Sequence, residues 1–141
     1  MVSSTAKPVS AAPLPERMYE WFNSLQGRAE PVAEQEVRTM WTEDCEMVTN
    51  GQVKCRGIPA FVKHFNEIRG KLKSWEVELP LAMRVAQQDR VAVYYRIGLV
   101  ANDGSNNGVL VCAIFEIRDG KAVRMTEVAH FEGAHLELEN H

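Results

Sequence analysis

Residues 109–131 read VLVCAIFEIRDGKAVRMTEVAHF, and the alternation of apolar residues in this stretch predicts two strands joined by a tight turn. A third run of the same kind precedes them at residues 91–99. Because alternate residues of a strand point to the same side, the three runs place their apolar residues on one sheet face. The inward positions are Val91, Val93, Tyr95, Ile97 and Leu99, then Val109, Val111, Ala113, Phe115 and Ile117, then Val123, Met125, Glu127, Ala129 and Phe131. Only Tyr95 and Glu127 interrupt this apolar face.

The turn between the last two runs sets their register. A three-residue loop, Arg118 to Gly120, pairs residue 117 with 121 and residue 115 with 123, so that odd positions meet odd positions. Such a loop favours glycine in its last, left-handed position, which Gly120 supplies. In this register we expect Glu127 to lie opposite Val111.

The rest of the chain predicts helices followed by strands. Helical spacing of apolar residues predicts helices over residues 15–25, 31–42 and 58–72, and Asn50-Gly51 predicts a hairpin of residues 45–49 and 52–56. A further strand is expected over residues 74–86, with a bulge or an edge at Pro80 because proline has no N–H to donate. This order predicts an α+β fold in which three helices pack on the concave face of a cone-shaped, curved antiparallel sheet. We expect one domain over residues 14–132, with a flexible tail at 1–13 and another at 133–141.

Composition argues against several classes of function. The 141 residues carry a net charge of −3 with mixed signs, which argues against a nucleic-acid partner, and no apolar run approaches the length of a membrane span. Residues 1–13 lack the hydrophobic stretch of a signal peptide, so the cytoplasm is the expected compartment. No cluster has metal-ligand spacing and no glycine-rich phosphate loop is present, so we expect neither a metal nor a cofactor.

Several short motifs, taken in order, resemble the nuclear transport factor 2-like superfamily, and its SnoaL-like branch in particular. They are the run Met40-Trp41-Thr42-Glu43-Asp44-Cys45-Glu46, the pairs Arg56-Gly57 and His64-Phe65, and the run Phe115-Glu116-Ile117-Arg118-Asp119-Gly120-Lys121 leading to Glu127. The resemblance covers residues 15–132. It implies a cystatin-like roll with a deep pocket, often a dimer, and activities that range from isomerases and cyclases to plain binding modules. Fold alone does not select among these.

The catalytic sets of two related enzymes are incomplete in this chain. The positions that resemblance to ketosteroid isomerases would give a general base, an oxyanion-holding acid and a first-helix tyrosine hold Thr49, Ala113 and Met18, with Tyr19 one residue away. Resemblance to limonene epoxide hydrolases matches their last-strand carboxylate to Glu127. Their remaining Arg and Asp fall near Tyr95 and Ile97, which breaks that triad.

Glu127, Tyr95 and His64 are the candidate catalytic residues. A carboxylate on an apolar face is costly unless it is paired or used, so Glu127 is either a general acid or base with a raised pKa or a structural partner of Arg84 or Tyr95. The Tyr95 hydroxyl either binds a ligand oxygen or is satisfied locally. His64 lies at the edge of its helical stripe and either looks into the pocket or serves packing.

We expect a pocket between the helices and the apolar sheet face that takes a small, apolar molecule. The predicted ligand-binding residues are Trp21, Phe22, Phe61, Phe65, Val93, Val111, Ala113, Phe115 and Met125. Two functions remain open. One is a cofactor-independent isomerase, cyclase, dehydratase or hydrolase that uses Glu127, and the other is a non-catalytic module that binds a hydrophobic ligand or only dimerises.

The opposite face of the same strands is also rich in apolar residues, and exposed faces of that kind favour an interface. Its members are Ala92, Tyr94, Arg96, Leu110, Cys112, Ile114, Thr126, Val128 and His130. We therefore expect a homodimer through the outer sheet face.

Overall fold

The computed structural model describes residues 13–134. Its helices are α1 (Leu14–Ser24), α2 (Glu34–Arg38) and α3 (Ile58–Lys71), with a short 3₁₀ turn at Glu132–Ala134. Its strands are β1 (Trp41–Thr49), β2 (Gln52–Arg56), β3 (Leu72–Val77), β4 (Met83–Gln87), β5 (Arg90–Ala101), β6 (Asn106–Arg118) and β7 (Lys121–Phe131). The expected tails at 1–13 and 133–141 lie almost entirely outside the described residues.

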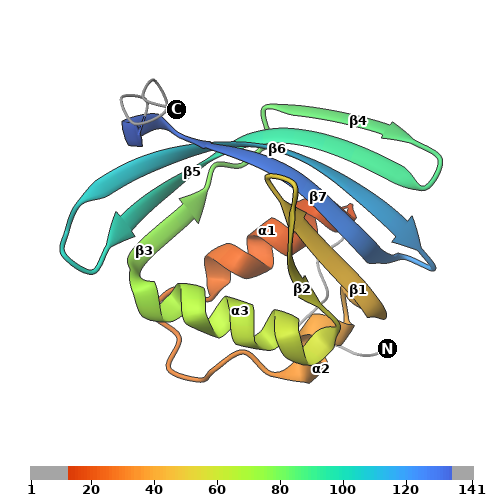
Figure 1. Ribbon diagram of the computed structural model, residues 1–141, viewed down its shortest axis with the longest axis horizontal. Helices are drawn as coiled ribbons and strands as arrows, with labels where there is room; N and C mark the ends of the chain where they lie inside the picture. The colour runs from red at the N-terminus through yellow and green to blue at the C-terminus, as the bar shows by residue number, and fades with distance from the viewer. Residues whose placement is uncertain (1–12, 135–141) are drawn as a thin grey trace, which may run out of the picture.

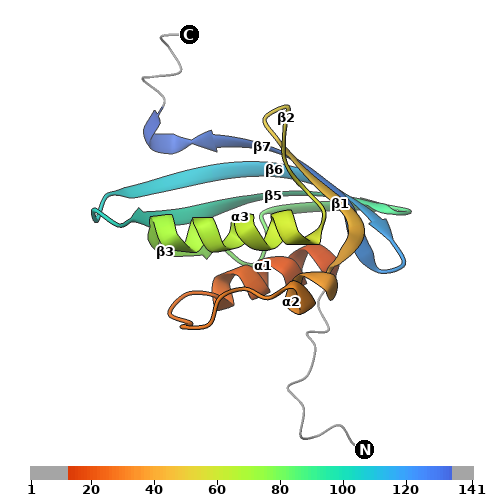
Figure 2. The same cartoon turned by 60° about the horizontal axis from the view of Figure 1, so that its bottom comes forward.

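The strands form one curved, open sheet in the order β2-β1-β7-β6-β5-β3, and β4 pairs with the other end of β5 (Figure 1). All three helices lie on one side of this sheet (Figure 2). The α+β class with helices on the concave face is confirmed. The sheet is mixed rather than wholly antiparallel, because β1 runs parallel to β7, with Met47 beside Met125 and Thr49 beside Glu127. None of the helices described over residues 13–134 is long and apolar enough to span a bilayer.

The helix expected over residues 31–42 is shorter than predicted. It covers only Glu34–Arg38, and the chain enters β1 at Trp41. The backbone N–H of Ala122 donates to the Met40 carbonyl over 2.8 Å, and Trp41 pairs with Ala122. Pairing with β7 therefore overrides the helical spacing of residues 37, 40 and 41.

The strand expected over residues 74–86 is two strands. The chain leaves β3 at Val77, passes Pro80 and re-enters the sheet at Met83. Both pieces pair with β5, β3 along residues 97–101 and β4 along residues 90–94. Pro80 thus lies between two edge strands, where its missing N–H costs no ladder hydrogen bond.

The β6–β7 connection keeps the predicted phase by a different route. Arg118 pairs with Lys121, so the turn has two residues, Asp119 and Gly120, both with positive φ (53° and 77°). Such a turn alone would pair odd positions with even ones. Glu116 pairs with Arg124 and Ile117 with Ala122, however, which leaves Val123 as the extra residue of a β-bulge.

Beyond the bulge, odd positions face odd positions again. Glu127 lies opposite Ala113, not opposite Val111 as expected.

Burial follows this phase closely. Val91, Val93 and Tyr95 on β5 and Val111, Ala113 and Phe115 on β6 are at most 5% exposed. Two predicted inward positions differ. Ala122 is fully buried in place of the bulged Val123, which is only partly buried, and Phe131 at the end of β7 is 44% exposed. The core thus lies between the concave face and the helices.

Candidate functional site

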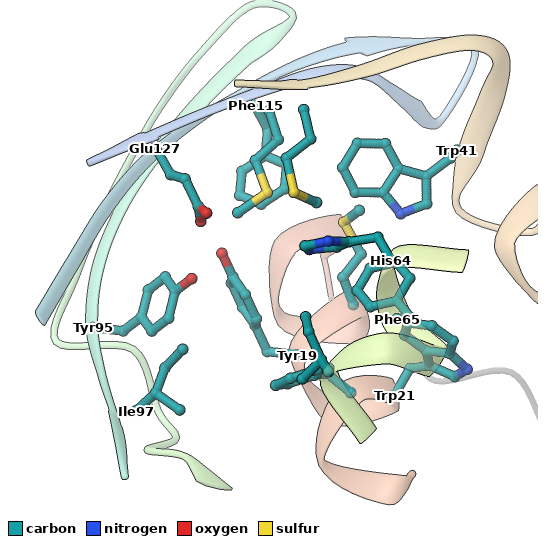
Figure 3. Close-up of a pocket in the computed structure, with 14 residues that line it drawn as sticks. Tyr19, Trp21, Trp41, His64, Phe65, Tyr95, Ile97, Phe115 and Glu127 are labelled. Atoms are coloured by element: carbon teal, nitrogen blue, oxygen red, sulfur yellow. The ribbon is translucent and has the colours of Figure 1, made fainter. Parts of the chain in front are cut away.

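A cavity of about 130 Å³ lies between the helix layer and the concave face of the sheet. Its wall is almost entirely apolar and aromatic (Figure 3). The lining residues are Met18, Tyr19, Trp21, Phe22, Trp41, Met47, His64, Phe65, Ile68, Tyr95, Ile97, Phe115, Met125 and Glu127. Six of the lining residues keep some solvent exposure, and we take their side as the opening of the cavity: Trp21, Phe22, His64, Ile68, Ile97 and Glu127.

Glu127 extends from β7 into this cavity. Its neighbours across the sheet are Ala113 on β6 and Thr49 on β1. The Thr49 hydroxyl donates to Glu127 Oε2 over 2.8 Å. Burial raises the pKa of Glu127, while the Thr49 hydrogen bond and the positive charge of Lys54 act in the opposite direction. A carboxyl group with a raised pKa holds and releases a proton nearer to neutral pH than an exposed one.

Glu127 makes no ion pair with any residue in the described part of the chain. Arg84, one of the two partners expected for a structural role, instead pairs with Glu16 on α1 at 2.9 Å. A lone carboxylate in an apolar wall is stabilised by protonation or by a bound polar group rather than by a fixed cation.

Tyr95 and Tyr19 face Glu127 from the sheet and from α1. Their ring centroids lie 4.4 Å apart, and both rings are buried, at 2% and 7% exposure. Figure 3 shows both hydroxyl groups pointing toward the Glu127 carboxyl group. Burial is the main cause of a pKa well above the ordinary value in both tyrosines, so both hydroxyls stay protonated and can donate.

The buried Tyr19 hydroxyl meets the Tyr95 hydroxyl, but it makes no hydrogen bond of full geometry within residues 13–134. A buried hydroxyl without a partner costs free energy, and a ligand oxygen would remove that cost. Sequence reasoning did not include Tyr19 in the site. The usable signal was its place one residue after Met18, on the buried side of α1.

His64 lines the cavity from α3, on the helix side (Figure 3). Burial is the main cause that lowers the pKa of His64, and Lys54 and Lys71 lower it further, whereas Glu67 opposes the change. The imidazole is therefore neutral at pH 7, with one nitrogen that donates and one that accepts.

The predicted ligand-binding residues divide into two groups. Five line the cavity: Trp21, Phe22, Phe65, Phe115 and Met125. The other four, Phe61, Val93, Val111 and Ala113, are buried in the core behind that wall. Because Trp41 belongs to β1 rather than to a helix, it reaches the cavity from the sheet, where its ring packs at a tilt of 55° against Phe61 with the centroids 4.5 Å apart.

One wall of the cavity is fixed by an ion pair. Trp21 Nε1 donates to Glu36 Oε1 over 3.1 Å, and Arg28 Nη1 and Nη2 donate to the two oxygens of Glu36 over 2.7 and 2.8 Å. The Ala33 N–H also donates to Glu36. The hydrogen bond from Arg28 is the main cause that lowers the pKa of Glu36 to about 2. The site contains no group of three or more His, Cys, Asp or Glu suited to a metal ion, and none occurs elsewhere in residues 13–134.

A family model described as the SnoaL-like domain matches residues 16–125. No curated protein sequence matches the chain significantly.

Solved structures give the same fold at low sequence identity. An NTF2-like protein of unknown function from Exiguobacterium is 19% identical, with a TM-score of 0.69 over 83% of this chain and 98% of that one. An LEH-like epoxide hydrolase of M. tuberculosis is 17% identical, with a TM-score of 0.63 over 83% and 81% of the two chains. TerC, crystallised with polyporic acid, is 18% identical, with a TM-score of 0.66 over 90% and 97%.

Proposed function

The chain belongs to the family of SnoaL-like domains, within the nuclear transport factor 2-like superfamily, and on that premise we propose that it is a cofactor-independent enzyme. The reaction is a proton transfer on a small, largely apolar molecule, catalysed by Glu127. This covers an isomerase, cyclase, dehydratase or hydrolase. An epoxide hydrolase among the structural relatives agrees with that range of chemistry.

The observation that carries the proposal is the set of groups that surround the Glu127 carboxyl group. Its carboxyl group lies in an apolar wall, takes one hydrogen bond from Thr49 and faces two tyrosine hydroxyls. Burial raises its pKa, which suits a group that exchanges a proton near neutral pH.

The other polar groups have complementary roles. Tyr95 and Tyr19 donate hydrogen bonds to a substrate oxygen and stabilise negative charge that develops on it. The neutral His64 contacts the substrate from the helix side, near the opening. A single apolar ring suits the enclosed volume, since an engineered cavity of about 150 Å³ holds benzene.

The test begins with a ligand. A thermal-shift screen over compounds with a single ring, such as monocyclic terpenoids and phenyl derivatives, identifies molecules that stabilise the protein, and turnover of those molecules is then measured. We expect Glu127→Gln to lower turnover by about 10²–10⁴ while substrate binding survives. Glu76→Gln, an exposed carboxylate on β3, is the matched control and should change nothing.

The alternative is a module that binds a hydrophobic ligand without catalysis. Glu127 makes no ion pair among the described residues. This favours the enzyme, because a module that only binds apolar ligands gains nothing from an unpaired carboxylate in its cavity wall. Ligands that bind and are never converted, in the wild type and in Glu127→Gln alike, would support the module instead.

We also propose that the protein forms a homodimer through the convex face of the sheet. Two rows of residues cross that face from β4 to β7, Met83-Tyr94-Cys112-Val128 and Val85-Ala92-Ile114-Thr126. Four of these are large apolar side chains with high exposure: Met83 at 65%, Val85 at 67%, Ile114 at 44% and Val128 at 62%. Light scattering that gives only the monomer mass of 15.9 kDa at micromolar concentration would rule out the dimer.

A further inference from the structure

Lys54 occupies an irregular position on β2. In the β1–β2 hairpin, Val48 pairs with Val53 and Met47 pairs with Cys55, so Lys54 has no residue opposite it. This is a β-bulge, a device that re-aims a side chain and is frequent beside active sites. The bulge therefore separates Lys54 from the regular alternation of its strand.

The charge of Lys54 acts on both titratable groups at the cavity opening. It lowers the pKa of His64 on α3, and it opposes the rise of the pKa of Glu127 on β7. α3 packs against β2, and only β1 separates β2 from β7 in the sheet, so the strand that carries Lys54 lies close to the elements that carry both groups. The other charges that act on His64 are Glu67 and Lys71, both from α3 itself.

Lys54 has no fixed partner in the described residues, neither an ion pair nor a hydrogen bond. Its neighbour Arg56 is engaged by Glu46 at 2.6 Å, and Arg124 holds the other oxygen of Glu46 at 2.8 Å. The nearby, partly buried carboxylate of Glu46 on β1 is thus already paired with two arginines and does not engage the exposed Lys54 ammonium group.

We propose that Lys54 is a specificity residue that selects substrates with a carboxylate, or another anionic group, at the end that faces the opening. The apolar ring of such a molecule fills the cavity between the aromatic side chains, and its anionic end lies beside Lys54. This inference rests on the proposed function, because it assumes that the cavity binds the substrate.

Two matched probes test the charge separately from the ring. Phenylacetate and phenylacetamide have nearly the same shape and differ by one negative charge. Trp21 and Trp41 line the cavity, so their fluorescence reports the binding of either probe. We expect Lys54→Gln to weaken phenylacetate by about three- to tenfold and to leave phenylacetamide unchanged.

Lys63→Gln is the control, since Lys63 is an exposed cation on α3 next to His64 in the sequence. It should leave the affinity for both probes unchanged, which excludes a general effect of net charge. Lys54→Glu should weaken phenylacetate further than Lys54→Gln, and added salt should reduce the difference.

The outcomes are distinguishable. If Lys54→Gln lowers the affinity for both probes equally, Lys54 shapes the cavity but does not recognise the negative charge. If the affinity for phenylacetate is unchanged, Lys54 has no role in recognition. Either result overturns the inference and leaves the role of Glu127 untouched. If neither probe binds the wild type, both the inference and the proposed binding of a single ring in this cavity are wrong.

Discussion

Glu36 in the helix layer contacts Trp21 of the cavity wall, and Glu127 in the sheet belongs to that wall, but the two carboxyl groups have opposite surroundings. Glu36 accepts hydrogen bonds from Arg28, Trp21 and the Ala33 N–H. Glu127 accepts one hydrogen bond, from Thr49. The first carboxyl group has a pKa lowered to about 2, chiefly by Arg28, and the second has a pKa raised by burial.

The difference separates structural from functional use of the same side chain. A carboxylate with a cation and several donors is held in one place and in one charge state, so it can fix Trp21 but cannot exchange a proton near neutral pH. A carboxyl group in an apolar wall without a cation remains free to gain or lose one. The following substitutions test this contrast, from the largest expected effect to the smallest.

Glu36→Gln should lower the free energy of unfolding at pH 7 by about 2 kcal/mol, a value reduced for partial exposure of the pair. Because folding lowers the pKa of Glu36, its contribution is present above the ordinary value near 4.5 and is lost as the pH falls toward 2. Urea unfolding of both proteins from pH 7 to pH 2 measures the change. Glu34→Gln on the same helix is the control, since its pair with Arg38 lies at the surface. A loss that does not shrink at low pH would contradict an ionic origin.

Ala113→Phe tests the space around Glu127. Ala113 lies opposite Glu127 and is fully buried without lining the cavity, so a phenyl ring there has to displace its neighbours. We expect a loss of about 1–3 kcal/mol in the free energy of unfolding, and loss of ligand binding as the ring pushes into the cavity. Denaturant unfolding and a binding titration measure the two effects. A variant that binds ligand as well as the wild type would show that Glu127 and the cavity are not coupled through this position.

Glu127→Gln should have the opposite sign to Glu36→Gln. It should raise the free energy of unfolding at pH 7 by on the order of 1 kcal/mol, because it removes a carboxylate that burial disfavours. Folding raises the pKa of Glu127, so the wild type loses stability as the pH rises from about 4.5 through the folded pKa. The gain of the variant should therefore vanish near pH 4, which thermal melts across this range would reveal. A large drop in melting temperature at pH 7 would count against the catalytic role.

Tyr19→Phe should give the smallest change. It removes a buried hydroxyl without a satisfied hydrogen bond, so the free energy of unfolding should stay the same or rise by up to about 1 kcal/mol. Affinity for a ligand with a carbonyl oxygen should fall, which calorimetric titration would measure. Tyr94→Phe on the convex face serves as the comparison, and equal effects of the two changes would remove Tyr19 from the site.

Much of the sheet was predictable because its pattern is carried by many residues at once. The phase of β5, β6 and β7 follows from burial of alternate residues, and it placed Glu127 and Tyr95 on the concave face. The register was not predictable in the same way. A two-residue turn with a bulge and a three-residue loop give the same phase, but they differ in register: Glu127 lies opposite Ala113 with the first and would lie opposite Val111 with the second.

The site itself was only partly predictable. Strand alternation specifies the direction of a side chain, so Glu127 was found, whereas Tyr19 lies at the margin of a helical stripe where direction is ambiguous. Trp41 was assigned to a helix because residues 37, 40 and 41 have helical spacing, and the pairing that makes it a strand residue comes from β7, more than eighty residues later. Lys54 was missed because a bulge leaves no mark in the local sequence.

The extra residue at Val123 has a consequence for how this chain tolerates changes in length. Val123 has no partner of its own on β6, so deletion of Val123 alone would remove the bulge and leave a regular two-residue hairpin. Glu116 would still pair with Arg124 and Ala113 with Glu127, so the acid would stay on the concave face. The connection can therefore lose one residue without moving Glu127, and we expect the variant that lacks Val123 to keep Glu127 in the cavity wall.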